Sequence, residues 1–191
     1  MRLPRLVLIT LLLATSTGPA IATVITVNGN GKAEYTTIQA AIDAAADSGD
    51  EIIVEAGIYT GTGDSVIDLQ GKTFLLRSSA GPEETIIDGQ NVRRAVVCEN
   101  NEGADTLLKG FTITGGSAVS GGGVYLDASH PPLQNCRVEY NTAQFGAGIF
   151  ANDSGAECLH CDIAHNTAVS SAYGGGVYIA GETTPSLMHC R

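Results

Sequence analysis

The sequence predicts an all-β fold, a right-handed parallel β-helix with rungs of about 25 residues and an α-helix that caps its N-terminal end. Three observations lead to this prediction: blocks that recur every 25 residues, apolar columns shared by the blocks, and polar residues that alternate with those columns. One series of blocks comprises residues 110–118, 135–143 and 160–168. A second series comprises 121–126, 146–151 and 174–179 and is in step with the first, except for three extra residues within 169–173 that we expect to form a loop insertion.

Five apolar columns run through the aligned blocks, and we predict that they face the interior. Column by column, their members are Leu108, Leu133, Cys158 and Leu187; Phe111, Cys136, Cys161 and Cys190; Ile113, Val138 and Ile163; Val124, Ile149 and Val177; and Leu126, Ala151 and Ile179. The residues on either side of the Ile113 column are mostly polar, which is the pattern of a strand with one buried face. The segments, about three to a rung, are too short for helices.

One polar column is expected to shape a corner of the coil. Asn141 and Asn166 share this column, and Gly116 precedes them. Asn and Gly tolerate a left-handed backbone, so we expect these residues to supply the sharp turn. Stacked Asn amides can also hydrogen-bond to one another along the axis.

The N-terminal half predicts one helix and a series of short strands. The helix begins after Thr36 or Thr37 and is ended by Gly49, and its apolar stripe comprises Ile38, Ala41, Ile42 and Ala45. An open stack exposes its first rung, so we expect the helix to cover that end. Strands are predicted at 51–59, interrupted by a turn at 56–57, and at 66–69, 74–78, 85–88 and 95–98.

Residues 1–22 have the form of a secretory signal peptide. Arg2 and Arg5 precede the apolar run 6–14, and Ala20-Ile21-Ala22 has the form of a cleavage site. We therefore predict a mature chain that begins at Thr23, is secreted or held at the cell surface, and has no membrane span after signal cleavage.

Residues 23–191 are predicted to form one β-helix domain that is truncated at its C-terminal end. Arg191 aligns with Arg137, the residue directly after a cysteine of the second apolar column, so the sequence stops inside an expected strand. We expect further rungs or another segment to follow.

The charge balance argues against a nucleic-acid partner. The chain carries 20 acidic and 10 basic residues. Removal of 1–22 takes away two basic residues and no acidic one, which changes the net charge from −10 to −12. Proteins that bind a phosphate backbone concentrate basic residues instead. The same charge disfavours acidic polysaccharides unless a cation bridges the two.

Several segments of the chain resemble those of a known protein family. Residues 35–61, 71–78 and 85–89 are similar to the opening of pectin-lyase-like right-handed β-helix proteins. The GFTITGG block and the NCxxxxNTA and GGGVY copies resemble rungs of bacterial right-handed β-helix repeat proteins and, more loosely, of polymorphic outer membrane proteins. The resemblance covers essentially all of 23–191. It implies the fold but leaves the function open, because lyases, hydrolases, esterases and adhesins share this scaffold.

The cysteines are interpreted first as small core residues. Three of them share one inward column, and the five are Cys98, Cys136, Cys158, Cys161 and Cys190. Two other interpretations stay open: a disulfide between rungs, which the rung spacing makes geometrically marginal, and a metal or redox site at the CxxC of 158–161. Their thiol or disulfide state does not follow from the sequence.

Two sets of outward residues are candidate functional sites. Arg137, Glu139 and Asp162 form the one compact acid–base cluster that the repeat brings together, and the alternative is a salt-bridge ladder between rungs. A second set, Tyr125, Phe150 and Tyr178, forms an outward aromatic column that could contact carbohydrate, and the alternative is a ladder that stiffens the sheet.

These features favour a non-catalytic binding or adhesive scaffold that presents a sheet face to carbohydrate or protein. The rungs are nearly uniform, and their loops are too short to wall a pocket. The alternative is a polysaccharide-degrading enzyme that works by pectate-lyase-like elimination or glycoside hydrolysis. No cofactor is predicted, although Ca²⁺ held by carboxylates would suit the enzyme alternative. Because His160, His165 and His189 are not expected to share a column, no metal cluster is predicted.

Overall fold

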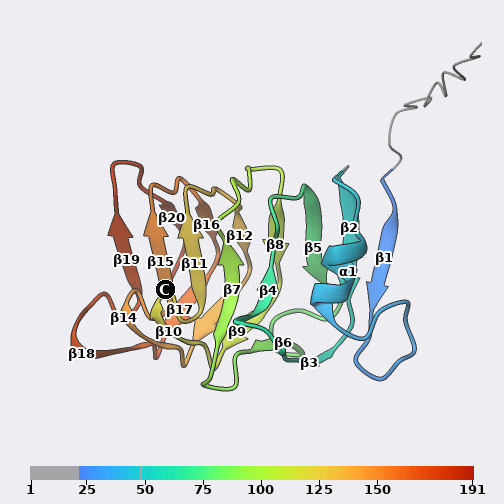
Figure 1. Cartoon of the computed structure of the whole chain (residues 1–191), viewed down its shortest axis with the longest axis horizontal. Coiled ribbons are helices and arrows are strands. Elements are labelled where there is room, and N and C mark those ends of the chain that lie inside the picture. The colour runs from blue at the N-terminus through green and yellow to red at the C-terminus, as the bar shows by residue number, and fades with distance from the viewer. Residues whose placement is uncertain (1–21, 48) are drawn as a thin grey trace, which may run out of the picture.

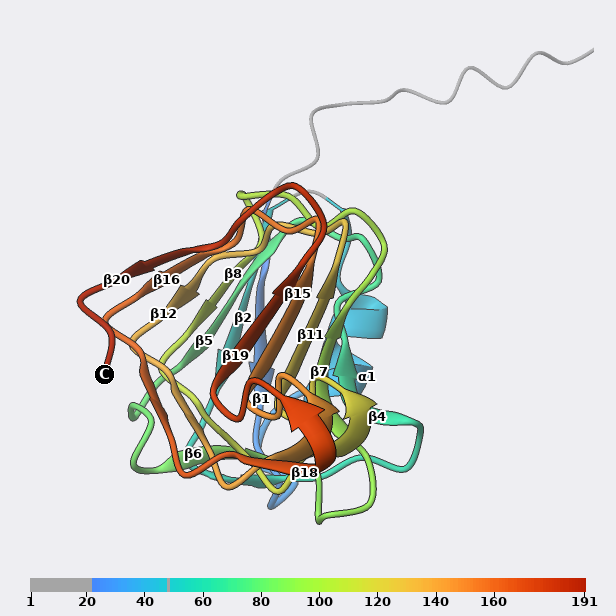
Figure 2. The same cartoon turned by 90° about the vertical axis from the view of Figure 1, so that its left-hand side faces the viewer.

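The chain winds into a coil of short parallel strands (Figure 1). The computed structural model describes residues 22–47 and 49–191, with the side chains of 170–172 excepted. The predicted signal peptide, apart from Ala22, lies outside the described residues. Seen from its C-terminal end, the chain turns counter-clockwise as it approaches the viewer, so the coil is right-handed (Figure 2). The predicted fold class, a right-handed parallel β-helix, is confirmed.

The strands of the described residues form four parallel sheets. The first sheet contains β1 (Val24–Val27), β2 (Asp50–Val54), β5 (Phe74–Ser78), β8 (Leu107–Lys109), β12 (Leu133–Gln134), β16 (Glu157–Leu159) and β20 (Ser186–Met188). The second contains β3 (Gly57–Tyr59), β6 (Thr85–Asp88), β9 (Thr112–Thr114), β13 (Arg137–Glu139) and β17 (Asp162–Ala164). The third contains β10 (Ser117–Ser120), β14 (Thr142–Phe145) and β18 (Thr167–Tyr173). The fourth contains β4 (Ser65–Asp68), β7 (Arg94–Cys98), β11 (Val124–Asp127), β15 (Ile149–Asn152) and β19 (Val177–Ala180).

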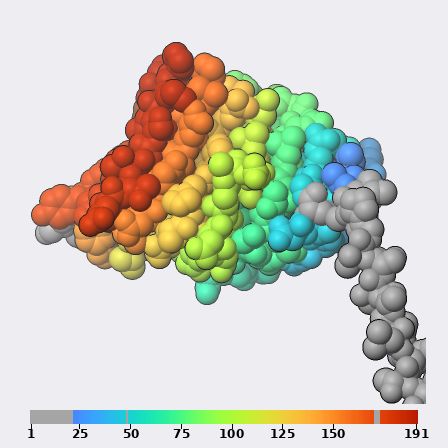
Figure 3. Space-filling model, turned by 90° about the horizontal axis from the view of Figure 1, so that it is seen from above, coloured from blue at the N-terminus to red at the C-terminus, as the bar shows by residue number. Residues whose placement is uncertain are grey.

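A complete rung has four strands, not the three that the sequence predicts. One such rung passes through β12, β13, β14 and β15 in turn. The strands of the third sheet lie in segments that were expected to be corners, because their small and polar residues show no clear alternation. Successive turns form separate oblique bands on the surface, each against its neighbours (Figure 3).

The register between rungs confirms the five inward columns. Val138 pairs with Ile113 on one side and with Ile163 on the other, and Val138 is fully buried while Arg137 is not. The columns become exposed at the last rung, where Leu187 and Ile179 are 45% and 43% exposed because no described strand lies beyond them.

The three extra residues predicted between 168 and 174 lie inside β18 and not in a loop. Ala143 pairs with Ala168, but the next paired residues are Phe145 and Tyr173, so the register shifts between them. The bulge takes up the insertion within one side of the rung.

The left-handed corner residues stand one position earlier than predicted. Positive φ angles of 60°, 56° and 56° occur at Gly115, Tyr140 and His165. Asn141 and Asn166 follow this turn, and their side chains point into the coil. The expected amide ladder is confirmed, since the Nδ2 of Asn141 donates to the Oδ1 of Asn166 over 3.0 Å.

The predicted cap is present, but its helix is shorter. Helix α1 spans Ile38–Ala44, with Thr37 as its N-cap, and it ends well before Gly49. Strand β1, which precedes the helix, was not predicted from the sequence. The side chain of Gln39 pairs with the edge of β4: its Oε1 accepts the N–H of Asp68 over 2.7 Å, and its Nε2 donates to the carbonyl of Asp68 over 3.3 Å. The helix therefore occupies the place of the strand that the fourth sheet lacks in its first rung.

Candidate functional site

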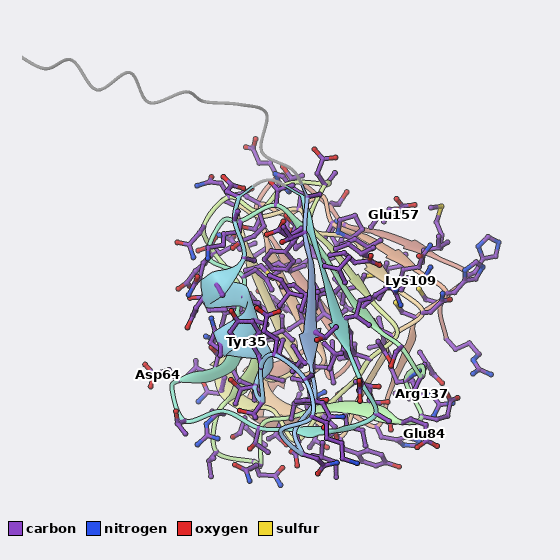
Figure 4. All side chains as sticks on the ribbon, turned by 90° about the vertical axis from the view of Figure 1, so that its right-hand side faces the viewer. Tyr35, Asp64, Glu84, Lys109, Arg137 and Glu157 are labelled. Atoms are coloured by element: carbon purple, nitrogen blue, oxygen red, sulfur yellow. The ribbon has the colours of Figure 1, made fainter. Side chains whose placement is uncertain are left out.

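The residues of the predicted acid–base cluster share a sheet face, but their charged groups pair elsewhere. Arg137 and Asp162 are register partners on β13 and β17. However, the Nη2 of Arg137 lies 2.6 Å from the Oε1 of Glu83, and Asp162 accepts from Arg191 over 3.2 Å. Glu139 stands opposite Ala164. Figure 4 shows Arg137 at the outer edge of the coil beside Glu84, the neighbour of Glu83.

These contacts correspond to the salt-bridge alternative. The guanidinium of Arg137 and the carboxylate of Glu83 are both well exposed, and exposed ion pairs contribute at most about 1 kcal/mol. Arg137 and Asp162 are each paired with a partner from another rung, so the cluster does not hold these two groups as an acid and a base facing a common substrate position.

The predicted aromatic column lies on the outer face of the fourth sheet. The rings of Tyr125 and Phe150 are stacked at 5.3 Å between centroids, and those of Phe150 and Tyr178 at 5.7 Å. Interplanar angles of 3° and 9° show that the three rings are nearly parallel. At such distances the rings are offset and partly cover one another's faces.

Two further rings extend the column around the corner into the third sheet. Phe145 lies 5.5 Å from Tyr178, and Tyr173 is stacked on Phe145 at 6.3 Å. Tyr173 is 64% exposed, the most open ring of the group. We call the five residues Tyr125, Phe145, Phe150, Tyr173 and Tyr178 the aromatic corner. Sequence reasoning missed Phe145 and Tyr173, because the insertion in β18 removes Tyr173 from the regular spacing.

A cation closes the N-terminal end of the aromatic corner. The guanidinium carbon of Arg94 lies 4.3 Å from the centre of the Tyr125 ring, a cation–π contact. Its Nε and Nη2 donate to the carbonyl of Ser120 over 3.2 and 2.8 Å, which fixes the guanidinium in place. Burial lowers the pKa of Arg94, although its charge persists because guanidinium remains protonated in proteins.

Polar groups flank the rings on the same sheet. The Nδ2 of Asn152 donates to the Oδ1 of Asp127 over 2.7 Å. The hydroxyl of Tyr125 lies 3.4 Å from the other oxygen of Asp127. Burial, followed by the nearby charge of Asp127, raises the pKa of Tyr125, so this hydroxyl stays protonated at neutral pH. The aromatic corner thus combines ring surface with hydrogen-bonding groups.

A groove of about 410 Å³ lies at the other end of the molecule, beside the cap. Hydroxyl, amide and carboxylate groups line much of it, including Gln39, Asp43, Asp68 and Gln70. Gln70 ties the two carboxylates together, since its N–H donates to Asp68 over 2.9 Å and its Nε2 to Asp43 over 2.8 Å. No sequence pattern indicated this groove, because its residues lie outside the repeats.

The cysteines and histidines form no candidate metal centre in the described part of the chain. All five cysteines are free thiols, and no group of three or more His, Cys, Asp or Glu side chains there is arranged to hold a metal ion. The expectation that the three histidines occupy different columns is wrong for one pair. His160 and His189 lie at the same left-handed corner position, with ring centroids 5.0 Å apart.

The chain shows only distant similarity to the known proteins with which it was compared. No protein-family model and no curated protein matches the sequence. Among solved structures, pectin methylesterase from carrot matches with 18% sequence identity and a TM-score of 0.47. The alignment covers 82% of this chain and 56% of the carrot chain, so the chain spans about half the length of that enzyme. At this similarity no residue role is transferred. Within the described residues, no helix is long and apolar enough to span a membrane.

Proposed function

We propose that the chain is a non-catalytic carbohydrate-binding scaffold, secreted or displayed at the cell surface, whose aromatic corner contacts a polysaccharide. The observation that carries this proposal is the aromatic corner itself: five rings that lie side by side on the outer faces of adjoining sheets. The outward ring edges, with Asp127 and Asn152 beside them as hydrogen-bonding groups, offer a continuous surface to a sugar chain.

The net charge selects among polysaccharides. The chain carries a net charge of −10, and exposed negative charges repel a polyanionic sugar chain over about 8–10 Å at physiological ionic strength. A neutral polysaccharide meets no such barrier. We therefore propose neutral glycans, not polygalacturonate, as the ligand class.

The dispersed contacts of Arg137 and Asp162 favour a binding role over catalysis. Acid–base or β-elimination chemistry needs two groups that face one reacting position. Here the two side chains pair with Glu83 and Arg191 instead. The polysaccharide-degrading alternative therefore has no assembled acid–base group in the predicted cluster.

Binding to immobilised neutral polysaccharides, measured with Tyr173→Ala and a matched control, tests the proposal. Tyr140 is the control, because it is 59% exposed and stacked on a neighbouring ring at a different corner. We expect Tyr173→Ala to weaken binding at least about tenfold, which corresponds to roughly 1.4 kcal/mol, and Tyr140→Ala to leave it unchanged.

Three results would overturn the proposal. The first is the same loss of binding in both variants, and the second is no binding to any neutral polysaccharide. The third is the release of unsaturated, ultraviolet-absorbing products from polygalacturonate and calcium, abolished by Arg137→Ala while the fold survives. That third result would establish an eliminating enzyme.

A further inference from the structure

The carboxylate of Asp50 joins three parts of the N-terminal cap. Asp50 begins β2 and is only 2% exposed. Its Oδ1 accepts the N–H of Thr23, the residue before β1, over 2.7 Å. Its Oδ2 accepts the N–H of Ala46, just beyond α1, over 2.8 Å. One buried carboxylate thus contacts the start of β1 and the chain that leaves the helix.

Both backbone polar groups of Thr23, its N–H and its carbonyl, are hydrogen-bonded. While its N–H donates to Asp50, its carbonyl accepts the N–H of Glu51 over 2.8 Å. The nitrogen of Thr23 therefore has a fixed position beside a buried carboxylate. This residue is also the first one after the Ala20-Ile21-Ala22 sequence, where signal-peptide cleavage is expected.

We propose that removal of the leader after Ala22 completes a charge pair between the new α-ammonium of Thr23 and the carboxylate of Asp50, so that processing stabilises the cap. Hydrolysis adds one water across the peptide bond between Ala22 and Thr23. It leaves a carboxylate on Ala22 and an amine on Thr23, and this amine takes up a proton at neutral pH. The nitrogen that donates to Asp50 then carries a full positive charge. The proposal rests on the predicted cleavage site and is independent of carbohydrate binding.

The change strengthens an existing contact without moving it. Before cleavage an uncharged peptide N–H donates to the carboxylate, and afterwards an ammonium donates to it from the same position. The bond is already charge-assisted before cleavage, because its acceptor is a carboxylate, and a charged donor adds the Coulomb attraction between two opposite unit charges. Because Thr23 is exposed while Asp50 is buried, water screens part of the gain, and the expected effect is moderate.

The position of the pair explains why this gain would matter for the cap. Strand β1 is the edge strand of the first sheet, and edge strands are the first to separate from a stack. Asp50 links Thr23, the residue before this edge strand, to the segment after α1, the helix that covers the end of the coil. Stabilising one contact therefore holds both cap elements against the first rung.

A comparison of two N-termini tests the inference. The mature chain beginning at Thr23 and the same chain extended by Ala22 are unfolded thermally, each with Asp50 and with Asp50→Asn. We expect the mature chain to unfold about 2–6 °C above the extended one. The difference should disappear with Asp50→Asn. Acetylation of the α-amine of the mature chain should reduce its midpoint to that of the extended chain, and this measurement needs no substitution if Asp50→Asn fails to fold.

Three results would overturn the inference. These are equal midpoints for the mature and extended chains, an unchanged midpoint after acetylation, and an exported protein whose first residue is not Thr23. Polysaccharide binding by the same samples separates this outcome from the fate of the proposed function, because the aromatic corner lies in later rungs.

Discussion

Asn141 and Asn166 lie one above the other in successive rungs, and a single oxygen of Asn166 accepts both the backbone N–H and the side-chain Nδ2 of Asn141, each over 3.0 Å. Asn141 is completely buried. Its Oδ1 accepts the N–H of Gly116 over 2.8 Å, and its Nδ2 also donates to the carbonyl of Ile113. The amide thus connects three rungs at one corner.

Replacement of Asn141 by Ala should destabilise the protein by about 2–4 kcal/mol, because the N–H of Gly116 and the carbonyl of Ile113 lose their contacts with the amide. Chemical denaturation measures the change. Asn152→Ala is the control, because Asn152 is only half buried and donates to Asp127 at the surface. A similar loss in both variants would contradict the special role of the buried amide.

Glu102→Ala should be among the most destabilising changes outside the apolar core, at about 3 kcal/mol or more. Glu102 is 1% exposed, and its carboxylate accepts from the N–H groups of Gly71 and Asn100 and from the hydroxyl of Ser129. Glu83→Ala, which removes only the exposed partner of Arg137, should change the free energy of unfolding by less than about 1 kcal/mol. If the two variants were equally stable, this account of Glu102 would fail.

Raising the pH above about 9 should destabilise the protein through its buried thiols. Burial raises the pKa of Cys158 from 9.0 to about 12, and burial likewise raises the pKa of Cys98 well above 9.0. Between these values the unfolded chain releases protons that the folded chain retains, so stability is full below about pH 9 and decreases as the pH rises toward 12. Each thiol contributes a slope of about 1.4 kcal/mol per pH unit in that range.

Denaturation curves at several alkaline pH values measure this slope, and Cys158→Ala should make it shallower. In addition, the native protein should resist alkylation of Cys98 and Cys158 at pH values where the unfolded chain reacts at once. Rapid alkylation of Cys158 in the folded protein would show that this thiol is not protected.

Cys161→Asp should destabilise the protein by several kcal/mol, because it places a charge without a partner in an inward column. The neighbouring change Asp162→Asn alters an outward residue and should cost less than about 1 kcal/mol. Thermal unfolding of the two variants compares adjacent inward and outward residues directly. Tolerance of Cys161→Asp would mean that Cys161 does not face the core.

The repeats made the rungs predictable, because stacking requires equivalent residues to meet at a fixed spacing. Leu133 and Cys158 could be paired from sequence because each rung repeats the same local environment. The N-terminal cap is not repeated, so β1 and the groove beside Gln39 carry no comparable signal. The displacement of the corner by one residue was missed because Tyr140, not an Asn or Gly, adopts the left-handed backbone.

The candidate site was predicted only where rigid side chains follow the register. The rings of Tyr125 and Phe150 stack as their strands pair, so the sequence located them correctly. Arg137 is long and flexible, and its guanidinium reaches Glu83 in an earlier turn, although Asp162 is its register partner. For charged residues on this surface, register determines where the Cα atoms lie but not which charges meet.

The bulge in β18 shows that this architecture can lengthen one side of a turn without altering the strand pairing of the next side. Three residues enter between Ala168 and Tyr173, yet Ile149 still pairs with Val177 a few residues further on. An extra segment at this corner therefore changes the path of the polypeptide only locally. The same corner carries Tyr173, so new surface can be added beside the rings while the pairing of the sheet that supports them is retained. The corner can thus vary in length while the core residues elsewhere in the rung keep their positions. This makes the corner a suitable place to graft or diversify a recognition surface.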